Sequence, residues 1–293
     1  MNHLLPQGLQ YNFILADGSR WVIAAGNEEA ASIVSQLGEA MQLRLTTGVI
    51  EPPLRGVVRR LLALVDAHNP KASLATCHAP LPFEDDSSVV CVLRSFTHSD
   101  GLFIQLVELS LAIARDAQTR GGVLIHGALA ERNGIGVILA APGGTGKTTA
   151  SARLPAPWRS LCDDTTLVVR DSQGNYQAHP WPTWSRFLDG GKGGKWDVQN
   201  AVPVKGIFFL SRAAEDRVES VGPGHAVSLL VECAEQTSQP MMRCLSKEET
   251  RALHLERFNN LCALARVVPA HVLNISLTGA FWHEIEKMLE GVH

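Results

Sequence analysis

Residues 121–149 read GGVLIHGALAERNGIGVILAAPGGTGKTT, and this stretch decides the fold class. Val123–Ala130 and Ile135–Ala140 have the composition of β-strands, and Asn133-Gly134 between them is typical of a tight hairpin turn. The second strand leads directly into a glycine-rich loop. In the common doubly wound fold, neighbouring parallel strands need longer crossover connections. The hairpin therefore predicts an α/β fold with a mixed sheet.

The glycine-rich loop Ala141–Thr148 has the spacing of a phosphate-binding loop, with Ala at the first position where Gly is usual. Its glycines can point successive N–H groups at an anion. Lys147 supplies a compact charge for the β- and γ-phosphates, and the Thr148 hydroxyl is a hard ligand for Mg²⁺. A short helix predicted from Lys147 to before Pro155 directs its positive end at the same point. The alternative is a glycine-rich turn that matches by chance. The predicted nucleotide-binding residues are Ala141, Pro142, Gly143, Gly144, Thr145, Gly146, Lys147, Thr148 and Thr149.

Two adjacent carboxylates follow in Ser160–Asp164, at the end of a predicted strand. A phosphoryl-transfer site needs an acid to hold metal and often another to accept the hydroxyl proton. Adjacent side chains on a strand point to opposite faces, so Asp163 and Asp164 can divide these tasks. A solvated turn or a helix cap is the alternative for such a pair. Their place one strand after the phosphate loop favours the catalytic interpretation.

His126 lies in the predicted strand LIHGAL, among apolar residues. Taken alone, such a residue is more often a buried, hydrogen-bonded histidine than a catalytic group. The residue pattern by itself therefore leaves both roles open.

In their order, these features resemble the HPr kinase/phosphorylase family and its phosphoenolpyruvate carboxykinase-like relatives. The matching elements are Ile125-His126-Gly127, the turn at Asn133-Gly134, the phosphate loop and Asp163-Asp164. The resemblance implies an HPr kinase-like P-loop domain that uses ATP and Mg²⁺. It also implies catalytic roles for His126, Lys147, Asp163 and Asp164, with His126 beside the phosphates. One Asp would be the base, for which we favour Asp163, and Asp164 would hold the metal together with Thr148.

The chain departs from the HPr-directed members of that family. Thr149 stands where they have an acid, and their later glycine signature with Glu and Arg is absent. These differences argue against HPr as the acceptor. The sequence is more similar to HPr kinase-like proteins of peptide natural-product pathways, such as the SynChlorMet cassette C proteins and the kinases of lasso-peptide precursors. Because HPr kinases are oligomers, a homo-oligomer is a plausible state.

The segment 179–197 combines flat apolar side chains with mobile cations. It could cover an acceptor peptide and neutralise charge in the transition state, or its tryptophans could pack on the core around a flexible loop. Its tryptophans are Trp181, Trp184 and Trp196, and its candidate acceptor or transition-state contacts are Arg186, Lys192 and Lys195. Arg212 and Arg217 are weaker candidates of the same kind.

The first third predicts a smaller α/β unit. It contains a hairpin around Asp17-Gly18, a helix capped by Asn27, a second helix over Leu54–Val65 and a strand over Ser88–Leu93. A further helix over Leu102–Ala117 follows a junction near residues 97–101. We therefore predict an N-terminal partner-recognition domain over residues 1–99 and a nucleotide-binding domain over residues 100–293.

The charge and hydropathy of the whole chain argue against some classes of binding partner. The chain has 293 residues, a formal net charge of −3 and a pI of about 6.4, so no global basic field favours nucleic acid or an anionic membrane. It lacks the pattern of a signal peptide, and no run approaches the roughly 18 apolar residues of a spanning helix. The six cysteines are scattered without a CxxC pair and are expected to be reduced. We expect a cytoplasmic protein that binds neither nucleic acid nor membrane.

The sequence thus predicts a kinase that needs ATP and Mg²⁺. Its expected acceptor is a Ser or Thr hydroxyl, or a terminal group, on a small protein or a ribosomally synthesised peptide. The two alternatives are a small-metabolite kinase and a nucleotide-gated binding module with little turnover.

Overall fold

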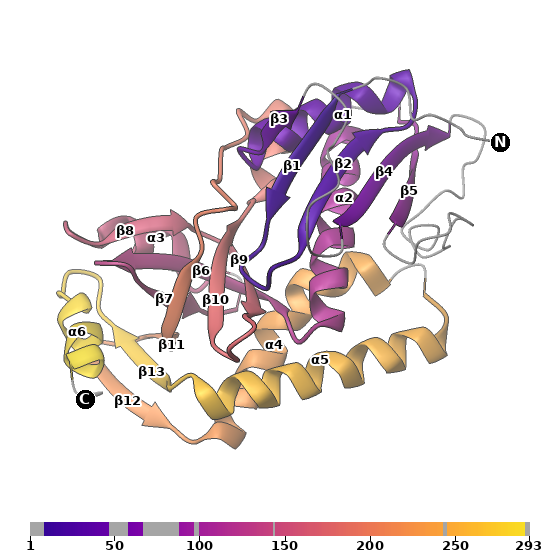
Figure 1. The fold of residues 1–293 in the computed structure, drawn as a ribbon. Coiled ribbons are helices and arrows are strands. Elements are labelled where there is room, and N and C mark those ends of the chain that lie inside the picture. The colour runs from indigo at the N-terminus through magenta and orange to yellow at the C-terminus, as the bar shows by residue number, and fades with distance from the viewer. Residues whose placement is uncertain are drawn as a thin grey trace.

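The computed structural model describes residues 9–46, 58–66, 88–96, 100–142, 144–242 and 245–290. Two mixed β-sheets and the helices packed on them give an α/β architecture (Figure 1). The N-terminal sheet lies at one end of the molecule, and the larger sheet with its helices forms the other.

The N-terminal sheet has the strand order β3-β1-β2-β4-β5 in the described residues. β1 and β2 form the predicted hairpin, with Gly18 in the left-handed conformation that its turn requires (φ 83°). Asn27 caps the following helix by accepting a hydrogen bond from the Ala30 N–H, also as predicted. The elements are β1 (Gln10–Ile14), β2 (Arg20–Ala25), α1 (Glu28–Ala40), β3 (Arg44–Thr46), β4 (Val58–Asp66) and β5 (Ser88–Arg94).

The predicted helix over Leu54–Val65 is wrong. Residues 58–66 form β4, which pairs in parallel with β2 on one side and β5 on the other, and residues 54–57 lie outside the described chain. Leu61 and Ala63 are fully buried and Leu62 between them is less so, which is the two-residue period of a strand. A short apolar run does not distinguish helix from strand, and pairing with two distant strands decided the outcome.

The second sheet follows the predicted hairpin, with the order β10-β9-β6-β7-β11-β13-β12 in the described residues, and β8 pairs with β6. β10 also pairs with the start of β11, so the sheet curls until strands from opposite sides of β6 and β7 meet. Its strands are β6 (Val123–Arg132), β7 (Ile135–Ala140), β8 (Arg159–Cys162), β9 (Thr165–Arg170), β10 (Tyr176–Trp181), β11 (Val202–Arg212), β12 (Arg217–Val221) and β13 (Ala270–Ile275).

The helices of this part lie around the second sheet (Figure 1). The long α5 begins with a capping box formed by the Ser246 and Glu249 side chains. None of the helices in the described residues has the length and apolar character of a membrane-spanning segment. The helices are α2 (Gly101–Thr119), α3 (Lys147–Arg153), the 3₁₀ turn η2 (Trp184–Gly190), α4 (Pro223–Met242), α5 (Lys247–Val267) and α6 (Trp282–Glu290).

Helix α2 joins the two sheets. It packs against α1 and β5 of the N-terminal part and against β6 and β9 of the second sheet. The β1–β2 turn is anchored next to it, because Arg120 at the end of α2 forms an ion pair with the nearly buried Asp17 (2.8 Å). The Ala16 N–H donates to Nε2 of His179 on β10 (3.1 Å). One continuous apolar core therefore extends through both parts. The predicted domain junction near residues 97–101 falls at the start of α2 and remains a prediction.

Glu108 on the buried face of α2 gives a test of this packing. Burial raises its pKa from 4.5 to about 7, although the positive charge of Arg94 opposes the shift. Between pH 4.5 and about 7, Glu108 is deprotonated in the unfolded chain but still protonated in the folded one. The free energy of unfolding therefore falls as the pH rises through this range and stays lower above it. Glu108→Gln should therefore stabilise the protein at pH 8, by on the order of 2 kcal/mol or several degrees in Tm, and leave it unchanged at pH 4.

Thermal unfolding followed by circular dichroism at both pH values measures this effect. Glu215→Gln on the exposed surface is the matched control and should change Tm at neither pH. An equal gain from Glu108→Gln at pH 4 and pH 8 would contradict the account.

Candidate functional site

The phosphate-loop sequence lies where the hairpin predicts, between the end of β7 and the start of α3. Gly144 and Gly146 have positive φ angles of 78° and 110°, which residues with a side chain rarely adopt. A Cβ atom at either position would meet nothing within 4 Å, so both glycines face open space. Gly143 lies outside the described residues. The hydroxyl-bearing Thr148 and Thr149 are exposed at the beginning of α3.

Lys147 is buried beneath this loop, with 5% of its surface exposed. Its Nζ donates hydrogen bonds to the carbonyl oxygens of Ala141 (2.9 Å) and Pro142 (3.3 Å). Burial lowers the pKa of the ammonium group, and the nearby Asp164 carboxylate and Cys233 thiol oppose the shift. Among the described residues, the ammonium is therefore bonded to neutral carbonyls, while a carboxylate acts on it electrostatically. An anion entering the loop would offer it a stronger partner.

Arg212 reaches the same loop from β11, the parallel neighbour of β7. Its guanidinium donates to the carbonyl oxygens of Gly144 (2.5 Å) and Thr145 (3.2 Å). Of the two weaker arginine candidates, Arg212 thus contacts the phosphate loop. Arg217 instead forms an exposed ion pair with Glu219 within β12.

The two aspartates follow β8 and diverge, as expected for adjacent residues of an extended chain. Asp163 accepts hydrogen bonds from the Thr183 hydroxyl (2.8 Å) and from Arg186 (2.6 Å). Asp164 accepts at Oδ1 from Nε2 of His126 (2.8 Å), and the Thr165 hydroxyl contacts its other oxygen at 3.3 Å. The structure therefore brings Asp164, His126 and Lys147 together and turns Asp163 toward the segment after β10.

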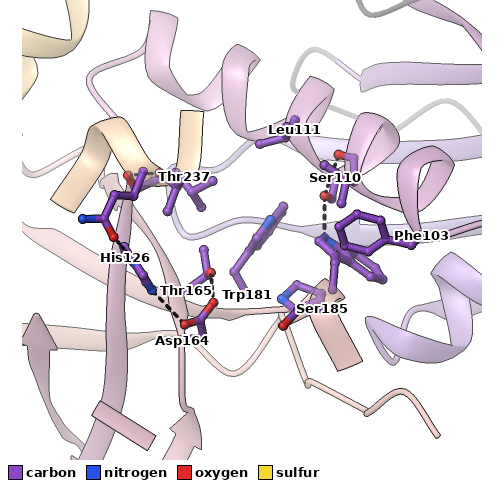
Figure 2. A pocket seen from close by; sticks show the side chains of 14 residues that line it. Phe103, Ser110, Leu111, His126, Asp164, Thr165, Trp181, Ser185 and Thr237 are labelled. Carbon is purple, nitrogen blue, oxygen red and sulfur yellow. Dashed lines mark hydrogen bonds and ion pairs between the residues drawn. The ribbon is translucent and has the colours of Figure 1, made fainter. Parts of the chain in front are cut away.

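Burial alone would raise the pKa of Asp164. The hydrogen bond and charge of His126, together with the charge of Lys147, outweigh that effect and hold the pKa below its usual value. Nδ1 of His126 contacts the amide oxygen of Gln236 on α4 at 2.5 Å. The imidazole ring therefore lies between an amide oxygen and a carboxylate, as Figure 2 shows. The two partners fix its orientation and keep it next to Asp164.

A cavity of about 220 Å³ opens beside His126 and Asp164 (Figure 2). Its walls come from α2, the start of β6, Asp164 with the start of β9, the end of β10 with the following turn, and α4. Apolar and aromatic groups predominate. They include Phe103, Val107, Leu111, Leu124, Trp181 and Trp184.

The segment 179–197 packs on the core through its tryptophans, and its role toward an acceptor stays a prediction. All three of its tryptophans are buried, so they pack on the core, and the Trp184 indole also donates to the Ser110 hydroxyl (2.8 Å). Arg186 lies at Asp163, as described above. Lys195 forms an exposed ion pair with Glu39 of α1 (2.9 Å), and Lys192 and Lys195 line a second cavity between α1 and this segment.

Sequence analysis missed helix α4 and with it Gln236. The apolar positions Ala226, Val227, Leu230, Cys233 and Ala234 are buried at helical spacing. This periodicity, with Pro223 at the first helical position, is the signal that could have found the helix. Burial raises the pKa of the Cys233 thiol to about 11, which keeps it protonated next to Lys147.

A family model described as SynChlorMet cassette protein ScmC matches residues 89–290. The chain belongs to the ScmC family. The match extends from β5 through α6 and includes all of the side chains at the phosphate loop and at His126 described above. No curated protein matches this ScmC-family chain.

Proposed function

We propose that this ScmC-family chain is an HPr kinase-like phosphotransferase that moves the γ-phosphoryl group of ATP to a hydroxyl of a peptide. One observation carries the proposal. The charges of Lys147, in the phosphate loop, and Asp164, between β8 and β9, act on each other. The cavity adjoins Asp164 and would hold the acceptor. Charge stabilisation, a proton acceptor and an acceptor site are thus adjacent, as phosphoryl transfer requires. The cassette in the family name supports a role in peptide modification.

The donors present fit Mg²⁺ carried with the nucleotide. In the described residues, no group of three or more His, Cys, Asp or Glu is placed to hold a metal. Mg²⁺ is commonly held by one or two protein oxygens together with phosphate oxygens and water. The exposed Thr148 hydroxyl supplies such an oxygen beside the loop. When bound, Mg²⁺ supplies positive charge that offsets the charge of the phosphates.

Each side chain then has a defined task. Lys147 exchanges its carbonyl partners for phosphate oxygens, and Arg212 borders the same loop as a second cation. The acceptor oxygen forms a bond to the γ-phosphorus, the bond to the β–γ bridging oxygen breaks, and ADP leaves. The hydroxyl proton goes to Oδ2 of Asp164, while His126 holds Oδ1 in place.

This assignment differs from the preference for Asp163 that the sequence suggested. Asp163 is engaged by Thr183 and Arg186, so its task is to position the turn that borders the acceptor cavity. Asp164 lines that cavity itself. We therefore assign the proton-accepting role to Asp164 and the metal-holding role to Thr148 with the phosphates.

Lys147→Ala should weaken ATP binding. Loss of a charge-assisted hydrogen bond to phosphate is expected to raise the Kd roughly ten- to hundredfold, measured by isothermal titration calorimetry with Mg²⁺. Lys205→Ala, which removes an exposed lysine of β11, is the matched control and should leave the Kd unchanged. Equal affinity of the Lys147→Ala variant and the unmodified chain would remove the phosphate-loop assignment.

Asp164→Asn should lower phosphoryl transfer about 10²- to 10⁴-fold, since it removes the proton acceptor, and should change the Kd for ATP by less than about threefold. Asp163→Asn should lower transfer less, because that side chain acts through Arg186 and Thr183. Transfer is measured by mass spectrometry as the gain of one phosphoryl group on a short serine-containing peptide. Full turnover by the Asp164→Asn variant, or a larger loss of phosphoryl transfer from Asp163→Asn, would contradict the assignment of Asp164 as the proton acceptor.

A further inference from the structure

We infer that the cavity beside His126 and Asp164 seats one uncharged, apolar side chain of the acceptor, next to the hydroxyl that is phosphorylated. This inference rests on the proposed function and specifies its substrate class. The charge of the cavity, its volume and the position of the Asp164 carboxylate support it.

Charge comes first. Of the described residues that line the cavity, none is Lys or Arg, and the ionisable ones are His126 and Asp164. An acidic or phosphorylated group would meet the Asp164 carboxylate without a lysine or arginine in the lining to offset it. A cationic group would have to leave water for walls made of Val107, Leu111 and Trp181. An apolar, neutral group avoids both costs.

Size then separates a side chain from a whole metabolite. Pockets that enclose a complete small-molecule ligand usually measure about 300–1,000 Å³. The cavity here has about 220 Å³. An apolar cavity of roughly 150 Å³ is known to hold benzene, so this space suits one aliphatic or aromatic side chain. The rest of the acceptor must lie outside, which favours a peptide over a small metabolite.

The position of the Asp164 carboxylate relative to the cavity places the acceptor hydroxyl. The Asp164 side chain retains 37% of its exposure, whereas Trp181 and Leu111 retain 1% and 4%. The carboxylate is therefore exposed at the edge of the cavity, whereas Trp181 and Leu111 form a buried part of its wall. A residue whose apolar side chain enters the cavity would leave the hydroxyl of its neighbour at Asp164.

The test uses the full chain and four synthetic tripeptides: acetyl-Leu-Ser-Leu-amide, acetyl-Ala-Ser-Ala-amide, acetyl-Glu-Ser-Glu-amide and acetyl-Lys-Ser-Lys-amide. Binding is followed by indole fluorescence, since Trp181 and Trp184 line the cavity. The Leu peptide should bind roughly ten- to hundredfold more tightly than the Glu and Lys peptides, as expected from burial of one large apolar side chain. Equal affinities, or a preference for Glu or Lys, would overturn the inference.

Val107→Phe on α2 fills the cavity and should remove the preference for Leu. Ile104→Phe makes a similar change one turn away on the same helix, outside the cavity lining, and should retain the preference. If Val107→Phe does not fold, Val107→Ala enlarges the cavity and should shift the preference toward acetyl-Phe-Ser-Phe-amide. Retention of the Leu preference by the Val107→Phe variant, or an unchanged preference in Val107→Ala, would overturn the inference.

Transfer from Mg²⁺-ATP to the same peptides separates this inference from the proposed function. Binding of the Leu peptide without any phosphoryl transfer would contradict the proposed function and leave the cavity assignment standing. Equal transfer to all four peptides would support the kinase and overturn the cavity assignment. Selective transfer to the Leu peptide supports both.

Discussion

The central constraint in this structure is a buried ammonium group. Lys147 has lost most of its water, and within the described residues its hydrogen bonds go to two backbone carbonyls. Burial of a charge is costly unless an opposite charge acts on it, and Asp164 supplies that charge from the neighbouring segment. This arrangement favours anion binding, because charged phosphate oxygens are stronger hydrogen-bond acceptors for the ammonium than neutral carbonyls.

The strand order explains why these groups meet. β6 pairs with β7 on one side and with β9 on the other. His126 therefore lies between the end of β7 and the start of β9, which Asp164 immediately precedes. Helix α4 packs on β6 and adds Gln236, which fixes the imidazole. Helix α2 closes the apolar side of the cavity with one face and contacts the N-terminal sheet with the other. The N-terminal part thus supports a wall of the cavity through α2.

Local motifs made part of this site predictable. The Asn133-Gly134 turn, the phosphate-loop spacing and the Asp-Asp pair are each set by a few consecutive residues. The structure has the turn, the strand–loop–helix order and the pair at a strand end as the sequence predicts, but Asp163 turns toward Thr183 and Arg186. The contact between His126 and Gln236 joins residues 110 positions apart, and five separate segments of the described chain line the cavity. No local pattern carries that information. The same reason explains the error at β4, where pairing with β2 and β5 overrode an ambiguous apolar run.

A crystal structure with Mg²⁺ and a non-hydrolysable ATP analogue tests the central claim most directly. The account predicts that the Lys147 ammonium leaves the carbonyls of Ala141 and Pro142 and bonds to phosphate oxygens. It also predicts that the γ-phosphate lies between the loop and Asp164, facing the cavity. A triphosphate bound elsewhere on the chain, or Lys147 still on its own loop beside the bound nucleotide, would contradict it.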